Sequence, residues 1–269
     1  RPGPIRHRDA AAPPAMSLDH TRRVFEALGR DDPLYAVLTR DGMEGGRWDP
    51  DEFFALGRAR VQEALDRLDA LGIRPRRGQA LDFGCGVGRL TEALADHFQQ
   101  VVGVDISAPM IEAARRYSRN SGVEYVVNTA GDLARFATGR FDFVFSAKTL
   151  QHIPPEHQRT YVREFVRLLT PGGVAMFQFR NGPRIEPGTL RARLYHLRRH
   201  HLRRLARRLR RRPEYEMHFV NRDELARIVA AGEAGVEDVE DLSRGRPGRN
   251  LRMVVRKPGD AWCTDAEVS

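Results

Sequence analysis

The chain has 269 residues, of which 41% are hydrophobic and 30% are charged, so it can build one sizeable core with a small additional cap. No apolar run approaches the roughly 20 residues of a membrane helix, and the basic first residues lack the apolar stretch of a secretory signal. The formal charge is +9, but eleven arginines fall between Arg191 and Arg212, and the remaining chain has a formal charge of −2. The only cysteines, Cys85 and Cys263, exclude a disulfide framework and a four-cysteine zinc site, so we expect a cytoplasmic protein without bound metal.

Two amphipathic patterns open the chain. Residues 1–17 are rich in proline and arginine and predict a disordered tail, whereas residues 18–28 and 51–71 have helical spacing. The linker between them is polar. We therefore expect an N-terminal helical cap over residues 18–75.

From residue 76 onward, short apolar strands alternate with helices of 10–15 residues. This alternation predicts a parallel, doubly wound α/β sheet. We expect strands at 79–83, 101–105, 123–127, 141–146 and 173–179, and helices at 89–98, 108–119, 155–169 and 222–231. The last two strands, at 236–242 and 251–256, have no helix between them and predict an antiparallel hairpin at the sheet edge. The expected parts are a core at 76–183, an insertion at 184–220, a completion of the sheet at 221–258 and a tail at 259–269.

A glycine-rich turn follows the first strand, where residues 81–90 read LDFGCGVGRL. Glycine lets the backbone turn tightly and approach a ligand, and the following helix offers free N–H groups. Such a turn holds either a dinucleotide or S-adenosylmethionine. Arg89 stands where a dinucleotide turn needs a small residue, and Asp82 would repel a pyrophosphate but balance a cationic amino group. The pattern therefore favours S-adenosylmethionine over a dinucleotide of the kind that dehydrogenases bind.

A second acid, Asp105, ends the second predicted strand, 23 residues after Asp82. A carboxylate at this place can accept two hydrogen bonds from ribose hydroxyls. The alternative is that Asp105 caps the next helix, a role that Ser107 fills better.

With these motifs, residues 79–179 resemble the class I S-adenosylmethionine-dependent methyltransferases. The resemblance implies a Rossmann-like seven-stranded sheet of order 3-2-1-4-5-7-6, with S-adenosyl-L-methionine bound at the carboxyl ends of strands 1, 2 and 4 and S-adenosyl-L-homocysteine as the product. The segment GDL at 131–133 is similar to the one whose acid meets the adenine amino group and whose next residue flanks the ring. The implied cofactor-binding residues are Asp82, Gly84, Cys85, Gly86, Gly88, Asp105, Ile106, Met110, Asp132, Leu133 and Ser146; for Cys85 we expect a filling role rather than a nucleophile.

Two histidines are candidates for a general base, because the ordinary histidine pKa suits proton transfer near neutral pH. His152 follows the fourth strand and His218 precedes the last helix; for His152, capping the loop or contacting the cofactor is an alternative role. His196 and His200 have metal-like spacing, but their arginine neighbours argue against a cation site. The candidates for binding the methyl acceptor are Lys148, Gln151, Gln178, Arg180 and Tyr215.

The arginine-rich segment has leucines at near-helical spacing and predicts a basic lid over the pocket. Docking of an anionic acceptor and binding of nucleic acid or a membrane surface are the alternatives. The aromatic residues of the N-terminal cap, Tyr35, Trp48, Phe53 and Phe54, form either a pocket wall or ordinary packing.

The function we expect is methyl transfer from S-adenosylmethionine to a small-molecule acceptor, with an oxygen atom favoured because a histidine base is available, in specialised metabolism. The alternatives are an RNA methyltransferase that uses the arginine-rich segment and a non-catalytic cofactor-binding protein. The sequence does not indicate the oligomeric state.

Overall fold

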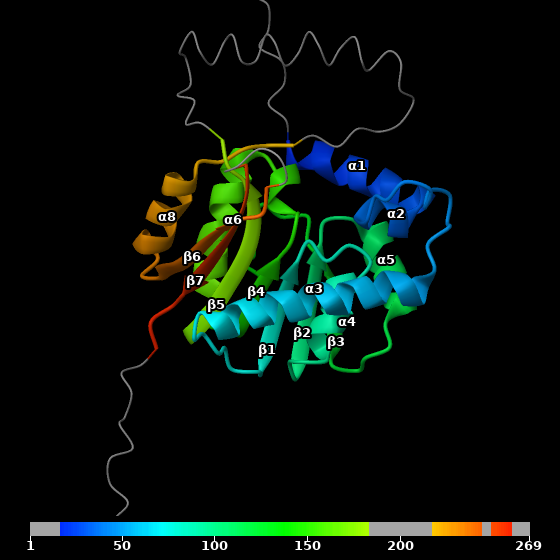
Figure 1. Ribbon diagram of the computed structural model, residues 1–269. Helices are drawn as coiled ribbons and strands as arrows, with labels where there is room; N and C mark the ends of the chain where they lie inside the picture. The colour runs from blue at the N-terminus through cyan, green and yellow to red at the C-terminus, as the bar shows by residue number, and fades with distance from the viewer. Residues whose placement is uncertain (1–16, 183–216, 244–248, 260–269) are drawn as a thin grey trace, which may run out of the picture.

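The structure is a computed structural model that describes residues 17–182, 217–243 and 249–259. Its centre is a seven-stranded sheet of order β3-β2-β1-β4-β5-β7-β6, which confirms the predicted order (Figure 1). The strands are β1 (Gln79–Phe83), β2 (Gln100–Asp105), β3 (Val123–Val127), β4 (Phe141–Ser146), β5 (Leu169–Arg180), β6 (Gly235–Asp241) and β7 (Asn250–Arg256).

The first five strands run parallel, and β7 lies antiparallel between β5 and β6. The predicted terminal hairpin is therefore confirmed, with its second strand inside the sheet and its first strand at the edge. The crossovers of a parallel sheet place helices on both faces, so the central strands are buried on both sides and read as continuous apolar runs. In β4 all six residues are buried.

Helices cover the two faces of the sheet (Figure 1). The helices are α1 (Leu18–Asp31), α2 (Pro33–Val37), α3 (Pro50–Ala70), α4 (Arg89–Ala95), α5 (Ala108–Tyr117), α6 (Pro155–Leu168), α8 (Arg222–Ala231) and the 3₁₀ turn η1 (Leu150–His152). One core joins α6 and α8 to the sheet, and another joins α3 and α4 to the opposite face. Strand β5 serves both, with Ala175 and Phe177 in the first and Val174 and Met176 in the second.

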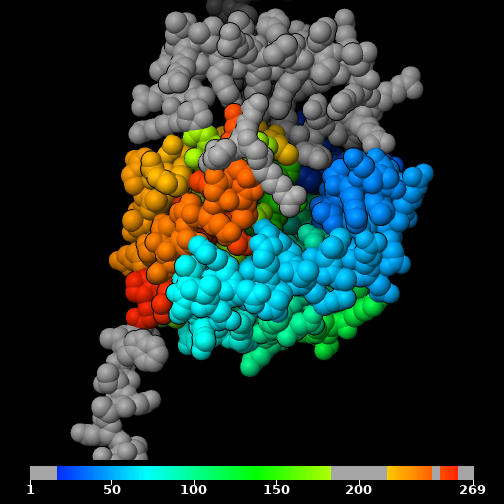
Figure 2. All heavy atoms as spheres, in the orientation of Figure 1, coloured from blue at the N-terminus to red at the C-terminus, as the bar shows by residue number. Residues whose placement is uncertain are grey.

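Helix α1 spans the edge at which the parallel strands end. The Ser107 hydroxyl, just after β2, donates to the Phe25 carbonyl at 3.2 Å, and the Thr21 hydroxyl donates to the His152 carbonyl at 3.3 Å. Two turns that follow different strands are thus tied to one helix. In Figure 2, the blue N-terminal helices and the cyan α3 form a continuous surface beside the orange residues of β6.

Several elements differ from the sequence prediction, among them the following three. Helix α2 occupies part of the expected linker, since Asp32 accepts from the Tyr35 N–H and Pro33 supplies a preset first turn. Helix α4 ends at Ala95 rather than residue 98. Strand β5 begins at Leu169 rather than residue 173, because Leu169 already pairs with Phe141 of β4. None of the helices in the described part of the chain is long and apolar enough to cross a membrane.

Candidate functional site

A cavity of about 1040 Å³ lies at the carboxyl ends of β1, β2 and β4, under α1 and α2. In open α/β sheets this edge is the usual place for a ligand. Eleven of the predicted site residues line it: Gly84, Cys85, Gly86, Asp105, Ile106, Met110, Lys148, Gln151, His152, Gln178 and Arg180. The structure thus brings most of the sequence-predicted residues to one place.

The glycine-rich turn is shaped by close packing on both sides. Gly84 has a φ of +75°, and a Cβ there would lie 2.1 Å from Cγ2 of Thr149. Gly86 has a φ of +55°, and a Cβ there would lie 2.6 Å from a methyl group of Val37 in α2. Both positions need glycine for the left-handed backbone and for space. Thr149 and Val37 therefore pack against the turn, and both glycines line the cavity without a side chain.

Asp105 ends β2 with its carboxylate in the cavity wall. Oδ2 accepts from the Gly86 N–H at 2.9 Å, and Oδ1 accepts from the Ser107 N–H at 2.9 Å. Burial raises the pKa of this carboxyl, while the two N–H groups oppose that rise. Each carboxylate oxygen has a further lone pair, so Asp105 can still accept two hydrogen bonds from a ligand.

Asp82 does not line the cavity, contrary to the expectation that it would face a ligand amine. It is 1% exposed and accepts a 2.7 Å hydrogen bond from the Thr91 hydroxyl of α4. Burial raises its pKa to about 7, against the lowering effects of Thr91 and Arg89. The buried Asp82 carboxyl stabilises the glycine-rich turn, because its partner Thr91 lies in α4, the helix that follows the turn.

The raised pKa of Asp82 makes a prediction about stability. Between pH 4 and 7 the folded chain holds a proton that the unfolded chain releases, so this group's contribution to stability falls as the pH rises, by at most about 4 kcal/mol. The Asp82→Asn variant does not titrate there and can still accept from Thr91. We expect the wild-type melting temperature to fall more between pH 5 and 8 than that of D82N, in thermal unfolding of both proteins. Equal falls would contradict the assignment.

Gly88 and Ser146 also lie behind the cavity rather than in its wall. Gly88 is the left-handed residue before α4, and the buried Ser146 donates to the Phe83 carbonyl at 3.0 Å, linking β4 to β1. Both therefore shape the turn without reaching the ligand space.

Cys85 lines the cavity, but burial raises the pKa of its thiol well above the usual range, which agrees with the expected filling role.

The segment that follows β3 corrects the expected adenine contact. Asp132 is exposed and its carboxylate accepts from the Ala134 N–H, while Leu133 is buried in the core. Instead, Asn128 at the end of β3 lines the cavity, with its Nδ2 donating to the Asp132 carbonyl at 2.8 Å. Its Oδ1 is left as an acceptor.

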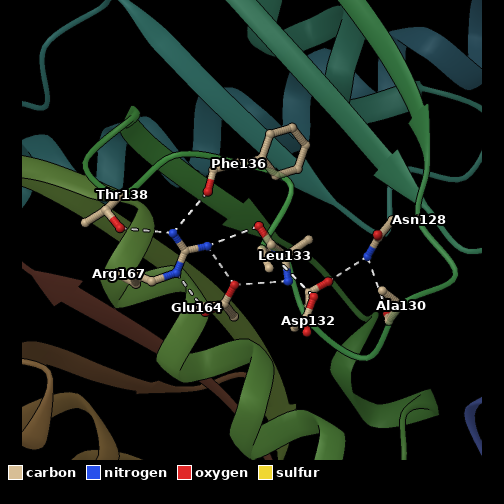
Figure 3. A network of polar contacts seen from close by, with 9 residues as sticks. Asn128, Ala130, Asp132, Leu133, Phe136, Thr138, Glu164 and Arg167 are labelled. Carbon is tan, nitrogen blue, oxygen red and sulfur yellow. Dashed lines mark hydrogen bonds and ion pairs between the residues drawn. The ribbon is translucent and has the colours of Figure 1, made fainter.

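Figure 3 shows the cause of this arrangement. Glu164 of α6 accepts from the Leu133 N–H at 3.0 Å, and Arg167 donates to the Leu133 and Phe136 carbonyls at 3.1 and 3.0 Å. The hydrogen bond from Arg167 lowers the pKa of Glu164, so the pair stays charged. These contacts hold the backbone with the side chain of Leu133 in the core, whereas that of Asp132 is exposed to solvent.

His152 lies at the other end of the cavity, in η1. Its ring meets Phe25 of α1 edge-on, with ring centroids 5.5 Å apart, and its Nε2 lies 3.1 Å from Nε2 of Gln151. Which of the two nitrogens donates depends on the tautomer of the ring and on the orientation of the Gln151 amide. A neutral imidazole beside a cavity can take a proton.

His218 is not in the cavity wall, contrary to its expected role as a second base. Its backbone N–H donates to the Gln151 carbonyl at 2.7 Å, so this segment lies behind η1. Its neighbour Met217 does line the cavity, and Arg180 contacts the Met217 sulfur. Tyr215 and the whole arginine-rich segment lie outside the described residues.

Lys148 lines the cavity with a left-handed backbone, at a φ of 61°. This conformation costs a residue with a Cβ about 1–2 kcal/mol. We expect the Lys148→Gly variant to be about 1 kcal/mol more stable than the Lys148→Ala variant. Both variants lose the lysine side chain, but only glycine adopts the left-handed backbone without strain. Chemical denaturation of the two variants measures this difference, and a less stable glycine variant would contradict it.

Sequence reasoning missed several parts of the wall. From α3 come Leu56, Arg60 and Glu63, from α1 come Thr21 and Phe25, and Arg89 and Asn128 were not assigned to the cavity. The aromatic residues of the cap do not line it: Trp48 and Phe53 lie in a separate core with partly buried Tyr35 and Phe54. A polar helix face opposite the apolar stripe of α3 was the only signal for Arg60 and Glu63.

Among the described residues, no group of three His, Cys, Asp or Glu side chains could hold a metal ion.

Comparison with known proteins gives one family and many relatives. Residues 81–177 match the family described as "Methyltransferase domain". A protein named "Ubiquinone biosynthesis O-methyltransferase" from Xanthomonas oryzae pv. oryzae is 36% identical over 132 residues, covering 47% of this chain and 52% of that protein. One of the same name from Bordetella avium is 32% identical over 136 residues, covering 50% of this chain and 56% of that protein. The chain thus spans about half the length of these relatives.

Solved structures show the same fold. The magnesium protoporphyrin IX methyltransferase of Synechocystis with bound S-adenosylhomocysteine is 19% identical, with a TM-score of 0.58 over 90% of this chain and 100% of that one. A protein from Pyrococcus horikoshii is 25% identical, with a TM-score of 0.52 over 83% of this chain and 97% of that one. Together with the strand order, these matches show that the chain has the fold of these solved structures and that residues 81–177 resemble the methyltransferase-domain family.

Proposed function

We propose that this protein transfers a methyl group from S-adenosylmethionine to an oxygen atom of a small anionic acceptor. The observation that carries the proposal is the bare turn at Gly84 and Gly86 beside the Asp105 carboxylate, in one cavity with His152. When bound, the cofactor supplies an electrophilic methyl group on its sulfonium. The relatives named as O-methyltransferases support an oxygen acceptor.

The residues at the ends of β1, β2 and β3 fit the nucleoside part of the cofactor. Gly84 and Gly86 line the cavity without side chains of their own, so a ligand can approach the backbone of the turn. Asp105 offers two acceptors for the ribose hydroxyls, and Oδ1 of Asn128 offers one for the adenine amino group. Ile106 and Met110 supply apolar surface for the ring.

The charge of the cavity favours an anionic acceptor. In the described wall, two carboxylates, Glu63 and Asp105, stand against four cationic side chains: Arg60, Arg89, Lys148 and Arg180. The cofactor adds one net positive charge. An anionic acceptor would lower the cost of gathering these charges in a partly closed site.

His152 is placed to act as the general base. A ring nitrogen of His152 with an unengaged lone pair would accept the proton of the acceptor hydroxyl, while the bound cofactor would supply the methyl group and keep the electron pair of the carbon–sulfur bond on its sulfur. Gln151 and Phe25 orient the ring, and α1 shields it from water. Holding both reactants in line can supply on the order of 7–11 kcal/mol of the barrier in favourable cases.

The proposal is tested by calorimetric titration with S-adenosylhomocysteine, followed by turnover assays with S-adenosylmethionine. The acceptor panel consists of phenols with and without a carboxylate. We expect saturable binding of the nucleotide and release of S-adenosylhomocysteine only with carboxylated phenols. Absence of nucleotide binding would overturn the proposal, and turnover with neutral phenols alone would overturn its acceptor class.

A further inference from the structure

Two arginines of the cavity wall have hydrogen-bonding capacity that the described chain does not use. The side chain of Arg89 lines the cavity, yet it makes no hydrogen bond within residues 17–182, 217–243 and 249–259, and its Nε is shielded from solvent. Arg60 pairs only with Glu63 within the same ranges. A guanidinium has five N–H donors in a planar fork that matches a carboxylate.

Arg89 is held in place by packing rather than by hydrogen bonds. Its guanidinium carbon lies 5.7 Å from the ring centroid of the buried Phe53. Helix α3 lies directly against its backbone, because Gly57 has no Cβ; an added Cβ would come within 2.4 Å of the Arg89 carbonyl oxygen. The cation is therefore positioned before any ligand arrives.

Arg60 is held by a chain of ion pairs that runs to the sheet edge. Its Nη1 lies 2.6 Å from Oε2 of Glu63, and Oε1 of Glu63 lies 3.4 Å from Nη1 of Arg252 in β7. Arg252 is 2% exposed and also pairs with Glu240 of β6 through Nε, at 2.9 Å. Gln178 of β5 is paired with Arg252 across the strands, so it faces the same side of the sheet as this chain and lines the same cavity.

The two arginines are close enough to influence one another. Burial lowers the pKa of Arg89 from its usual range, and the Arg60 charge lowers it further, while Asp82 opposes both. Placing two like charges beside one cavity is unfavourable without a compensating anion. Glu63 compensates the charge of Arg60, whereas Asp82 compensates that of Arg89 only in part, since the pKa of Asp82 is about 7.

We propose that Arg89 and Arg60 form a carboxylate-binding subsite on the α3 side of the cavity. This inference rests on the proposed function. The carboxylate belongs either to the acceptor or to the amino-acid end of the cofactor, and both sources present the same group to the two guanidinium forks.

The test compares matched ligands with and without a carboxylate in the wild type and in the Arg89→Met, Arg89→Lys and Arg60→Met variants. The control is Arg58→Gln, an exposed arginine on the same helix. Calorimetry measures S-adenosylhomocysteine against 5′-methylthioadenosine, which lacks the amino-acid end. With S-adenosylhomocysteine bound, it then measures 3,4-dihydroxybenzoate against catechol. Thermal unfolding confirms that each variant is folded.

We expect R89M and R60M to lose about 10- to 100-fold in affinity for one carboxylated ligand while keeping the affinity for its matched partner. A loss confined to S-adenosylhomocysteine assigns the subsite to the cofactor, and a loss confined to 3,4-dihydroxybenzoate assigns it to the acceptor. R89K keeps the charge beside Asp82 but lacks the fork, so it should lose most of the same affinity. R58Q should bind like the wild type.

Equal affinities of wild type and folded variants for all four ligands would overturn the subsite. If the wild type binds S-adenosylhomocysteine but the variants show no carboxylate-specific loss, the subsite alone fails. If the wild type binds neither nucleotide, the proposed function itself fails, and the subsite falls with it.

Discussion

Replacing Asp105 with alanine should weaken the binding of S-adenosylhomocysteine by about 100-fold or more. The variant removes both acceptors offered to the ribose hydroxyls and leaves those hydroxyls unpaired in a partly closed site, at a cost of a few kcal/mol. It also removes the hydrogen bond from the Gly86 N–H to the Asp105 carboxylate, and this hydrogen bond orders the glycine turn. Isothermal titration calorimetry of both proteins measures the loss.

Two comparisons separate the ribose contact from a loosened turn. The first comparison uses the 2′,3′-dideoxy analogue of S-adenosylhomocysteine, which lacks both ribose hydroxyls. The wild type should bind this analogue as weakly as D105A binds S-adenosylhomocysteine, and D105A should bind both ligands with the same affinity. Asp132→Ala is the matched control, because that acid is exposed and outside the cavity wall, so we expect unchanged affinity. An unchanged affinity in D105A, or a large loss in D132A, would contradict the assignment.

The affinity for S-adenosylhomocysteine should also depend on pH, in a direction that the pKa of Asp105 determines. Burial raises the pKa of Asp105, so acidification converts it to the neutral form at a higher pH than for an ordinary aspartate. The neutral form has fewer acceptors for the ribose. Affinity of the wild type should therefore fall as the pH is lowered, and the fall should be smaller in D105A.

Replacing His152 with glutamine should slow turnover by about 10²- to 10⁴-fold while the affinity for S-adenosylhomocysteine changes little. The reason is that the His152 ring lies in the cavity wall, where it can take the acceptor proton, whereas the proposed cofactor contacts lie at the ends of β1, β2 and β3. Single-turnover kinetics with a carboxylated phenol measures the chemical step. Raising the pH should partly restore the variant, because a more ionised phenol needs no base.

The control for this prediction is His218→Gln. His218 lies behind η1 and outside the cavity wall, so its loss should leave the chemical step close to the wild-type rate. A normal rate in H152Q would contradict the base assignment. A large rate loss in H218Q alone would move the base to that residue.

The central sheet could be predicted because its signals are local. Each parallel strand is a short apolar run between polar or glycine-rich turns, and β1, β3 and β4 have the predicted bounds. The start of β5 could not be predicted, since Leu169 joins the sheet only through its partner Phe141 in another strand. Helix α2 was missed although Asp32 and Pro33 form a capping signal, because its five residues leave no periodic pattern.

The cofactor end of the site was predictable for the same reason. Gly84, Gly86 and Asp105 stand at strand ends, and the sheet order alone brings them together. The position of Asp132 depends on Glu164 and Arg167, which lie more than 30 residues away, so its local pattern indicated the wrong orientation. In the same way, Arg60 reaches the cavity only because α3 packs against the sheet, a contact that no local motif encodes.

The central claim is that an S-adenosyl nucleotide lies across the glycine turn with its ribose on the second acid. A crystal structure of the protein grown with S-adenosylhomocysteine measures this directly. The account predicts both ribose hydroxyls within hydrogen-bond distance of the Asp105 carboxylate and the adenine amino group at Asn128. A nucleotide bound elsewhere, or one whose ribose hydroxyls lie away from Asp105, would contradict it.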